Sequence, residues 1–154
     1  MSNIDFRRLI PTEKMSGETT EDTKLLRAML HKAEEFMRSY KWCPEISQRY
    51  LGFGVGGIVA VFLFRFREKI ANTDDLLWVI VGDLPSAYVV VDRAPDARAA
   101  LAIYCDLMAA WAGAILQHTP LDAVFPVKAE ATEQNARQME SRIDFLKTEI
   151  IPTL

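Results

Sequence analysis

Three runs of strand-forming residues follow one another in the middle of the chain, and they constrain its fold most. They cover residues 58–67, 76–82 and 87–92 and are dense in Val, Ile, Phe, Trp and Tyr. The linkers between them, EKIANTDD and DLPS, are short. Linkers this short join antiparallel neighbours, because a parallel return needs a crossover of about a dozen residues or more. The sequence therefore predicts a three-stranded antiparallel meander.

Helical periodicity flanks the meander on both sides. An apolar stripe predicts a first helix that has Thr19 as its N-cap and ends before Pro44. A segment that is apolar nearly all round predicts a second helix over 95–117, with Pro95 at its first position. Thr132 can cap a last helix. We expect a two-layer α+β fold with the order α-β-β-β-α-α, in which the meander packs against three helices.

A chain of 154 residues fits one domain. Residues 1–18 show no helical or strand periodicity, and we expect them to form a loosely ordered N-terminal arm. A single α+β domain then covers residues 19–154. Within it, the sequence predicts two long connections, at 41–57 and 117–131.

Aligning the strands by their loops predicts which side chains share a face of the sheet. The first turn places Arg65 opposite Trp78, and the second turn places Trp78 opposite Val90. One face is then wholly apolar and must carry the helices. Its residues are Phe62, Phe64, Phe66, Leu77, Val79, Val81, Val89 and Val91.

The other predicted face mixes apolar, charged and aromatic side chains, which is typical of a surface for a ligand or partner. The alternative is that a helix or the N-terminal arm covers it. Asp83 follows the second strand, where its carboxylate either caps its own turn or is displayed for a ligand. The candidate residues for a ligand or partner surface are Arg65, Arg67, Trp78, Asp83 and Tyr88.

Two patterns that suggest a cofactor or a metal lack the context that this chemistry needs. Residues 52–57 match the letters G-x-G-x-x-G, but a loop precedes them and a strand follows, so a dinucleotide is not expected. We interpret them as a flexible approach to the first strand, or as a place where another backbone packs closely. His31, Glu34 and Glu35 have ligand spacing, yet no second ligand motif accompanies them, and a solvated charge ladder explains them. We expect neither cofactor nor metal.

The two cysteines predict reduced thiols rather than a disulfide or a nucleophile. Cys43 lies at a helix C-terminus, whose dipole disfavours a thiolate, and Cys105 lies in an apolar stripe. The N-terminus shows no signal peptide, so we expect a cytoplasmic protein.

Charge and hydropathy argue against two classes of partner. The chain has 18 basic and 21 acidic residues, a net charge of -3, and no strongly basic segment, so nucleic acid is not an expected partner. The longest apolar stretch, residues 51–64, contains four glycines and is shorter than the roughly 20 residues that span a bilayer. We therefore expect no membrane partner.

Three segments, YLGFGVGGIVAVFLF, LWVIVGDLPSAYVVVD and RIDFLKTEIIP, together resemble a family of small uncharacterised bacterial proteins. The resemblance covers about residues 40–152, and WVIVGDLPSAY is its most specific part. It implies a bacterial, cytosolic, single-domain protein, and it assigns no activity and no catalytic residue.

Two functions remain open. The first is a non-enzymatic binding or protein-interaction module that acts through the mixed sheet face or residues 42–57. The alternative is a small enzyme with a site between loops 41–57 and 117–131, for which the candidates are Asp83, Glu45, Arg49 and Tyr50. A deep pocket with several of these polar groups would favour the enzyme, and a broad flat apolar patch would favour the binding module.

We also expect a homodimer. The second helix and the second sheet face leave more apolar surface than a two-layer domain can cover, and a twofold interface would bury it. If instead the N-terminal arm covers this surface, through Ile4, Phe6, Leu9 and Ile10, a monomer is expected.

Overall fold

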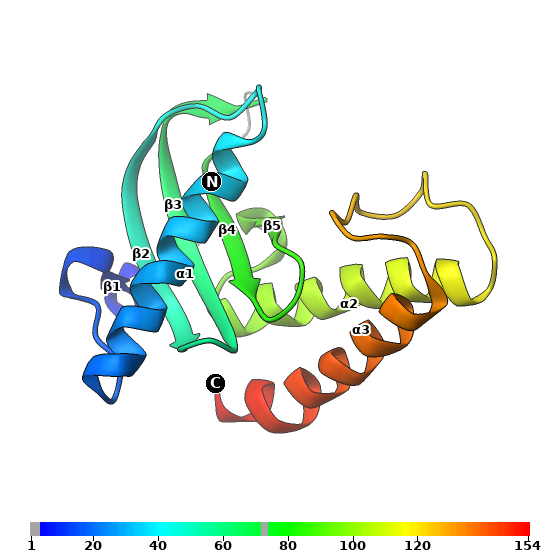
Figure 1. Cartoon of the computed structure of the whole chain (residues 1–154). Helices are drawn as coiled ribbons and strands as arrows, with labels where there is room; N and C mark the ends of the chain where they lie inside the picture. Colours follow the sequence, from blue (N-terminus) through cyan, green and yellow to red (C-terminus); the bar gives the residue numbers. More distant parts are fainter. Residues whose placement is uncertain (1–3, 72–73) are drawn as a thin grey trace.

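A computed structural model describes residues 4–71 and 74–154. In this part of the chain, five strands form one antiparallel sheet in the order β1-β2-β3-β4-β5 (Figure 1). The predicted antiparallel meander is confirmed, and the sheet has two strands more than predicted. The strands are β1 (Ile10–Pro11), β2 (Ile46–Val55), β3 (Val59–Ile70), β4 (Asp74–Gly82) and β5 (Ala87–Val90).

Strand β2 lies where the sequence predicted a long connection. Its alternation is hidden because the register shifts twice along its pairing with β3, between Ile46 and Gln48 and between Leu51 and Phe53. It also contains glycines, which strands disfavour. A Cβ on Gly52 would lie 2.9 Å from the Cβ of Ala97, so this glycine allows a helix to approach the strand. The close neighbour at Gly52 is thus a helix side chain, and Gly52 and Gly54 lie within β2 rather than in a flexible approach to a strand.

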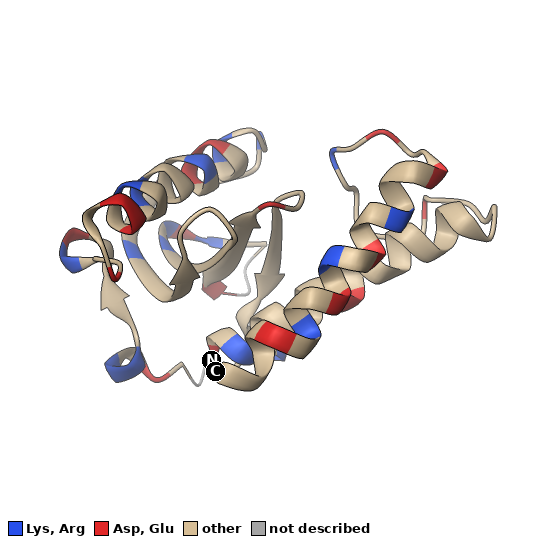
Figure 2. Cartoon of the chain, turned by 60° about the horizontal axis from the view of Figure 1, so that its bottom comes forward, with Lys and Arg blue, Asp and Glu red and all other residues tan. Residues whose placement is uncertain are grey.

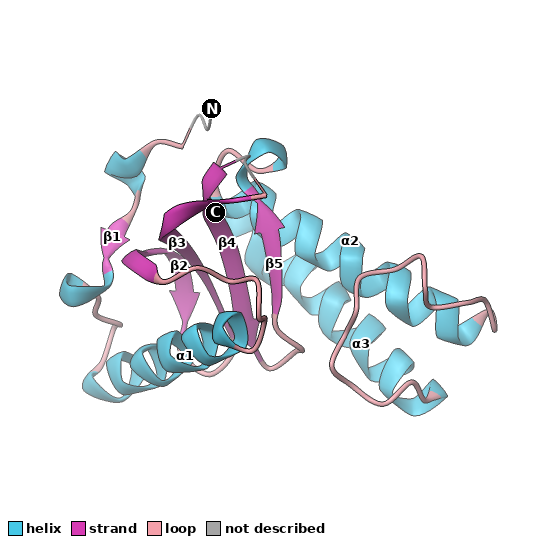
Figure 3. Ribbon diagram, turned by 90° about the horizontal axis from the view of Figure 1, so that it is seen from above, coloured by secondary structure: helices cyan, strands magenta, loops and turns pink. Residues whose placement is uncertain are grey.

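Helices cover both faces of the sheet, so the predicted two-layer arrangement is wrong (Figure 3). Helix α1 (Thr20–Arg38) packs on one face, and α2 (Ala97–Leu116) packs on the other. Helix α3 (Glu133–Phe145) lies beside α2, and the two run together past the edge of the sheet (Figure 1). The result is three layers, with a separate apolar core on each side of the sheet.

The ends of the helices follow from the capping residues. Thr19 accepts a hydrogen bond from the backbone N–H of Asp22 at 3.0 Å, and Thr132 caps α3 in the same way, which confirms both predicted caps. Helix α2 begins at Ala97 rather than at Pro95, because Asp96 is the N-cap residue and its side chain accepts a hydrogen bond from the backbone N–H of Ala99. Helix α3 continues into a π-helical turn, Leu146–Ile150, and a 3-10 turn, Ile151–Thr153.

The strand registers differ from those predicted. Arg65 pairs with Leu76 and Leu63 pairs with Trp78, a shift of two residues that leaves every side chain on its predicted face. Trp78 pairs with Val89 rather than with Val90, a shift of one residue. A shift of one turns a whole strand over, so Tyr88 faces α1 and Val89 faces α2, opposite to the prediction.

The face that was predicted to be a mixed surface is covered. Trp78 is completely buried there, under α2 and the N-terminal segment. Residues 4–18 pack against the rest of the domain. Strand β1 pairs with β2, and the ring of Phe6 packs edge-on against Tyr50 at 5.3 Å. The alternative in which a helix and the arm cover this face is the one observed.

Helix α2 is long and apolar enough to cross a membrane by length and composition alone. In this structure 44% of the residues in its apolar 18-residue stretch are buried, against the sheet and against α3. Core helices of folded domains often have this character.

We predict that Phe64→Ala lowers the free energy of unfolding by about 3–5 kcal/mol, because Phe64 is fully buried between β3 and α1. Phe62 and Phe66 are buried beside it, as the sequence predicted. Urea unfolding followed by circular dichroism measures this loss. Glu68→Ala on the same strand is the control, since Glu68 is exposed, and it should change stability by less than about 0.5 kcal/mol.

Candidate functional site

The last residue of β4 and the connection to β5, together residues 82–86, lie where three hollows in the surface meet, and we call this segment the β4–β5 loop. Asp83 and Leu84 line all three hollows. Helix α1 and its Lys32 border one of them, and α3 with its Arg142 borders the other two. The loop thus lies between α1, on one side of the sheet, and α3, which packs beside α2 on the other.

The first hollow is an apolar cavity of about 260 Å³ between the β4–β5 loop, α2 and the C-terminal end of α3. Ile58 and Phe145 are both exposed at its edge. The volume is below the roughly 300–1,000 Å³ of most drug-sized ligand sites, so the cavity suits one apolar side chain or a small fragment. Its other lining residues are Val59, Val81, Gly82, Asp83, Leu84, Tyr104, Arg142 and Leu146.

Tyr104 fixes the position of the loop. Its hydroxyl donates a hydrogen bond of 2.6 Å to the backbone carbonyl of Pro85, and its side chain is buried at the bottom of the cavity. Burial raises the pKa of this phenol far above its ordinary value, so Tyr104 stays protonated and remains a donor. The tyrosine therefore ties the loop to α2 and presents no charge to the cavity.

Asp83 and Arg142 form an ion pair at the mouth of the cavity. The Nε of Arg142 lies 2.9 Å from Oδ2 of Asp83, and both side chains are about half exposed. A pair this exposed adds little stability. The Nε–H is one of five guanidinium donors, so the Arg142 side chain can bind a second carboxylate while it holds Asp83.

Two lysines border the third hollow, which lies on the α1 side of the loop and has a volume of about 500 Å³. Lys32 of α1 donates to the carbonyl of Gly82 at 2.9 Å. Lys128, in the connection between α2 and α3, donates to the hydroxyl of Ser39 at 2.7 Å. Together with Arg142, three cations surround a loop that carries one carboxylate. Figure 2 shows the charges distributed along α1 and α3, while α2 carries few.

Of the five residues predicted to form a surface, only Asp83 lies at this loop. Arg65 pairs with Asp75 at 2.9 Å, and Arg67 pairs with Glu45 at 3.3 Å, both toward the opposite end of β3. Trp78 is buried in the core, where its Nε1–H donates to the carbonyl of Ala94 at 2.8 Å. Tyr88 faces α1, on the other side of the sheet. The structure thus does not gather the predicted residues on one face.

The four candidate catalytic residues are also separated. Arg49 pairs with Glu34 of α1 at 3.3 Å, whereas Tyr50, the next residue, packs on Phe6 on the opposite face of the sheet. Glu45 and Asp83 lie at opposite ends of β3, because Arg67 is near Glu45 and Val59 pairs with Gly82. Residues 46–55 form a strand rather than a loop. The enzyme site predicted between loops 41–57 and 117–131 is therefore not assembled.

The groups considered for metal or nucleophile chemistry have other partners. His31 bonds Glu35 at 2.9 Å and Glu34 pairs with Arg38, as in the expected charge ladder, but Glu34 is largely buried and also pairs with Arg49 of β2. Within residues 4–71 and 74–154, no three His, Cys, Asp or Glu side chains gather as metal ligands would. Burial raises the pKa of the Cys105 thiol to about 11 and also raises that of Cys43, which keeps both as thiols.

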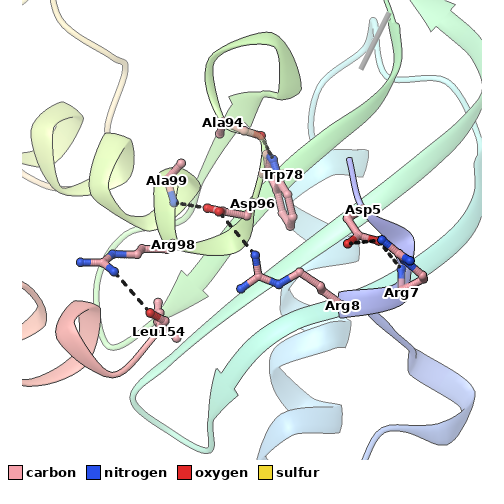
Figure 4. Close-up of polar contacts among 9 residues, drawn as sticks. All are labelled: Asp5, Arg7, Arg8, Trp78, Ala94, Asp96, Arg98, Ala99 and Leu154. Carbon is pink, nitrogen blue, oxygen red and sulfur yellow. Dashed lines mark hydrogen bonds and ion pairs between the residues drawn. The ribbon is translucent and has the colours of Figure 1, made fainter. Parts of the chain in front are cut away.

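A further hollow of about 260 Å³ lies where the N-terminal segment meets the start of α2 (Figure 4). The arginines at this hollow already have partners within the chain. Arg8 lies 3.8 Å from Asp96, and Arg98 donates to the carbonyl of Leu154 at 3.4 Å. The hydrogen bond from Arg7 lowers the pKa of the Asp5 carboxyl. These contacts hold the N-terminal and C-terminal segments against α2, and they leave the β4–β5 loop as the better candidate.

The sequence model of a Domain of unknown function (DUF4826) matches residues 21–149. The match runs from the first turn of α1 into the π-helical turn after α3, so it includes the β4–β5 loop and its three cations. The chain belongs to the DUF4826 family. The predicted resemblance to a family of uncharacterised proteins is thereby confirmed. Neither the curated proteins nor the solved structures contain a match to this DUF4826 chain.

One residue of the site, Asp83, was predictable from its place in the turn after a strand. The site also contains four residues that no sequence pattern indicated: Tyr104, Lys32, Lys128 and Arg142. Each of these lies on a different element, and on a helix an isolated cation has the pattern of an ordinary solvated residue. No local spacing connects them, so only the fold brings them to the β4–β5 loop.

We predict that Tyr104→Phe destabilises the protein by about 1–2 kcal/mol, because it removes the hydrogen bond to Pro85 and leaves that carbonyl without its partner. Amide hydrogen exchange should accelerate at residues 83, 84 and 86. Tyr40→Phe is the matched control. The Tyr40 hydroxyl is buried without a partner among the described residues, so its removal should be neutral or stabilising. Equal losses in the two variants would contradict this role of Tyr104.

Proposed function

We propose that this domain is a non-enzymatic binding module and that the β4–β5 loop receives an acidic segment of a partner protein. In this proposal, one apolar side chain of the partner enters the cavity beside Tyr104, and neighbouring carboxylates meet Arg142 and Lys32. The observation that carries the proposal is the apolar cavity with exposed Ile58 and Phe145 at its edge and a cation at its mouth.

Charge supports an acidic rather than a basic segment. The chain as a whole is negative, with a net charge of -3, yet Lys32, Lys128 and Arg142 surround a loop whose only carboxylate is already paired. Complementary charge mainly sets orientation and partner choice, while a buried apolar anchor supplies most of the affinity. The site places an apolar cavity directly beside cations.

The protonation states at the site favour binding over catalysis. Catalytic acids, bases and nucleophiles generally have pKa values near the working pH. Here burial keeps Tyr104, the one titratable group among the described residues that is buried in the cavity wall, protonated, so it supplies a hydrogen-bond donor and no base. Both unpaired thiols also fit the expected reducing, cytoplasmic environment.

The test uses two synthetic pentapeptides in which a central phenylalanine is flanked by glutamates or by lysines. Titration followed by calorimetry should show that the glutamate peptide binds at least about tenfold more tightly, since only its charges match the loop. Arg142→Glu should reduce that affinity by about tenfold or more.

Arg137→Glu is the control for this experiment. It makes the same charge change on the same helix, at an exposed residue paired with Glu133 and away from the cavity, so affinity should change by less than about twofold. Equal binding of both peptides would contradict the proposal. So would equal losses in the two arginine variants.

We also propose that the domain forms a homodimer through the outer face of α2. The second sheet face no longer supplies apolar surface for an interface, because α2 and the N-terminal segment cover it. The outer face of α2 remains. Ile103 and Leu107 are only partly buried there, Ala110 is exposed, and a Cβ added to Gly113 would meet no atom within 4 Å. Such small residues would let two helices approach closely.

Light scattering at micromolar concentration should give twice the chain mass of 17.4 kDa. Ala110→Arg should return the protein to a monomer, because it places a large charged side chain at the proposed interface. Ser141→Arg, on the exposed side of α3, should remain dimeric. A mass of one chain for the unmodified protein would refute the dimer.

A further inference from the structure

Five aromatic side chains pack together beside the third hollow, and we call them the aromatic cluster. They come from the end of α1, the turn that follows it, β5 and the connection between α2 and α3. Ring centroids of neighbouring members lie 5.1 to 5.5 Å apart in several pairs, mostly edge to face. The members are Phe36, Tyr40, Trp42, Tyr88 and Phe125.

The ammonium group of Lys128 sits over the faces of two of these rings. Its Nζ lies 5.4 Å from the centroid of Phe36 and 5.2 Å from that of Tyr40, within the range of a cation–π interaction. The same Nζ donates to the hydroxyl of Ser39. An aromatic site for a cation is therefore present, and a lysine of the chain itself occupies it.

The rings and the lysine are held very differently. Phe36 belongs to α1, Tyr88 belongs to β5, and contacts between rings link them through Tyr40. Lys128 belongs to the long connection 117–132, which has no helix or strand and is mostly exposed. Phe125 shares this connection with Lys128, but the rings of Phe36, Tyr40 and Tyr88 contact one another without it. If Lys128 moves away, these three rings therefore keep their contacts and the faces of Phe36 and Tyr40 open to solvent.

We propose that the faces of Phe36 and Tyr40 form a binding site for an alkylated ammonium group, and that Lys128 is an internal occupant which such a ligand displaces. A trimethylammonium group suits the rings better than a plain lysine from solution, because it is weakly hydrated and loses less on leaving water. Quaternary ammonium groups are the usual ligands of aromatic cages. The ligand is either a free small cation or the methylated lysine of a protein.

This inference stands apart from the proposal for the β4–β5 loop. It rests on the ring faces of Phe36 and Tyr40, whereas the loop proposal rests on the cavity at Tyr104 and Arg142; Lys128 borders both places, but the loop proposal keeps Lys32 and Arg142 without it. Either one can fail without the other. Displacement of Lys128 would also free its charge beside the third hollow, which it borders together with Lys32.

The experiment titrates the full chain with choline, with its neutral carbon analogue 3,3-dimethylbutan-1-ol, and with a hexapeptide that carries either trimethyllysine or unmodified lysine. Tryptophan fluorescence reports binding. Of the three tryptophans, Trp42 is 45% exposed and packs on Tyr40 at 5.1 Å, whereas Trp78 and Trp111 are buried.

Lys128→Ala should raise the affinity for choline or for the trimethyllysine peptide by about tenfold or more, because it removes a tethered competitor that occupies the ring faces. Lys32→Ala is the matched control. It removes the same charge from the same hollow, and since Lys32 bonds Gly82 instead, affinity should change by less than about twofold. Comparing choline with the peptide distinguishes a free cation from a modified side chain as the ligand.

Variants of the rings complete the test in the Lys128→Ala background. Phe36→Leu and Tyr40→Leu should each abolish binding, while Tyr40→Phe keeps a ring face and should retain it. Thermal unfolding checks that each variant is folded. If Phe36→Leu does not fold, because Phe36 is the more deeply buried ring, Tyr40→Leu alone tests the loss of a ring face. The proposal is overturned if neither cation saturates the Lys128→Ala protein. It is also overturned if the neutral analogue binds as tightly as choline, or if binding survives the loss of the Tyr40 ring.

Discussion

The paired segments 59–64 of β3 and 76–81 of β4 are apolar on both faces of the sheet, and the rest of the structure follows from this constraint. Every residue from Val59 to Phe64 in β3 is buried, as is every residue from Leu76 to Val81 in β4. A sheet of this kind cannot turn either face to water. Helix α1 must therefore cover one face, and α2 with the N-terminal segment must cover the other. The β4–β5 loop emerges between these layers, which is why groups from α1 and α3 meet at its two sides.

The parts of the fold that local patterns determine were predictable from the sequence. The helix caps at Thr19 and Thr132 and the burial of Phe62, Phe64 and Phe66 are confirmed. Strand β2 was not predictable, because bulges and glycines interrupt its alternation. The third layer was not predicted, because charged and aromatic side chains such as Arg65 and Trp78 made the second face resemble a surface, and a register error of one residue at β5 wrongly added Tyr88 to it.

The candidate site was predictable only at Asp83, because a carboxylate in a tight turn after a strand is a local signal. Its other groups meet through tertiary structure alone. Tyr104 reaches the loop from α2, Arg142 from α3 and Lys32 from α1. The aromatic cluster shows the same limit, since Lys128 is far in sequence from the rings of Phe36 and Tyr40 that it covers. Burial and charge at these places, rather than any motif, point to binding.

A two-dimensional NMR map of the backbone amides tests most directly whether the β4–β5 loop is the binding surface. The spectrum of the full chain would be recorded during titration with the glutamate-flanked peptide. The account predicts that the shifts concentrate at residues 58–59, 82–86 and 142–146, which surround the apolar cavity. Shifts that concentrate instead around Arg8, Asp96 and Arg98, or that spread evenly over the molecule, would contradict it.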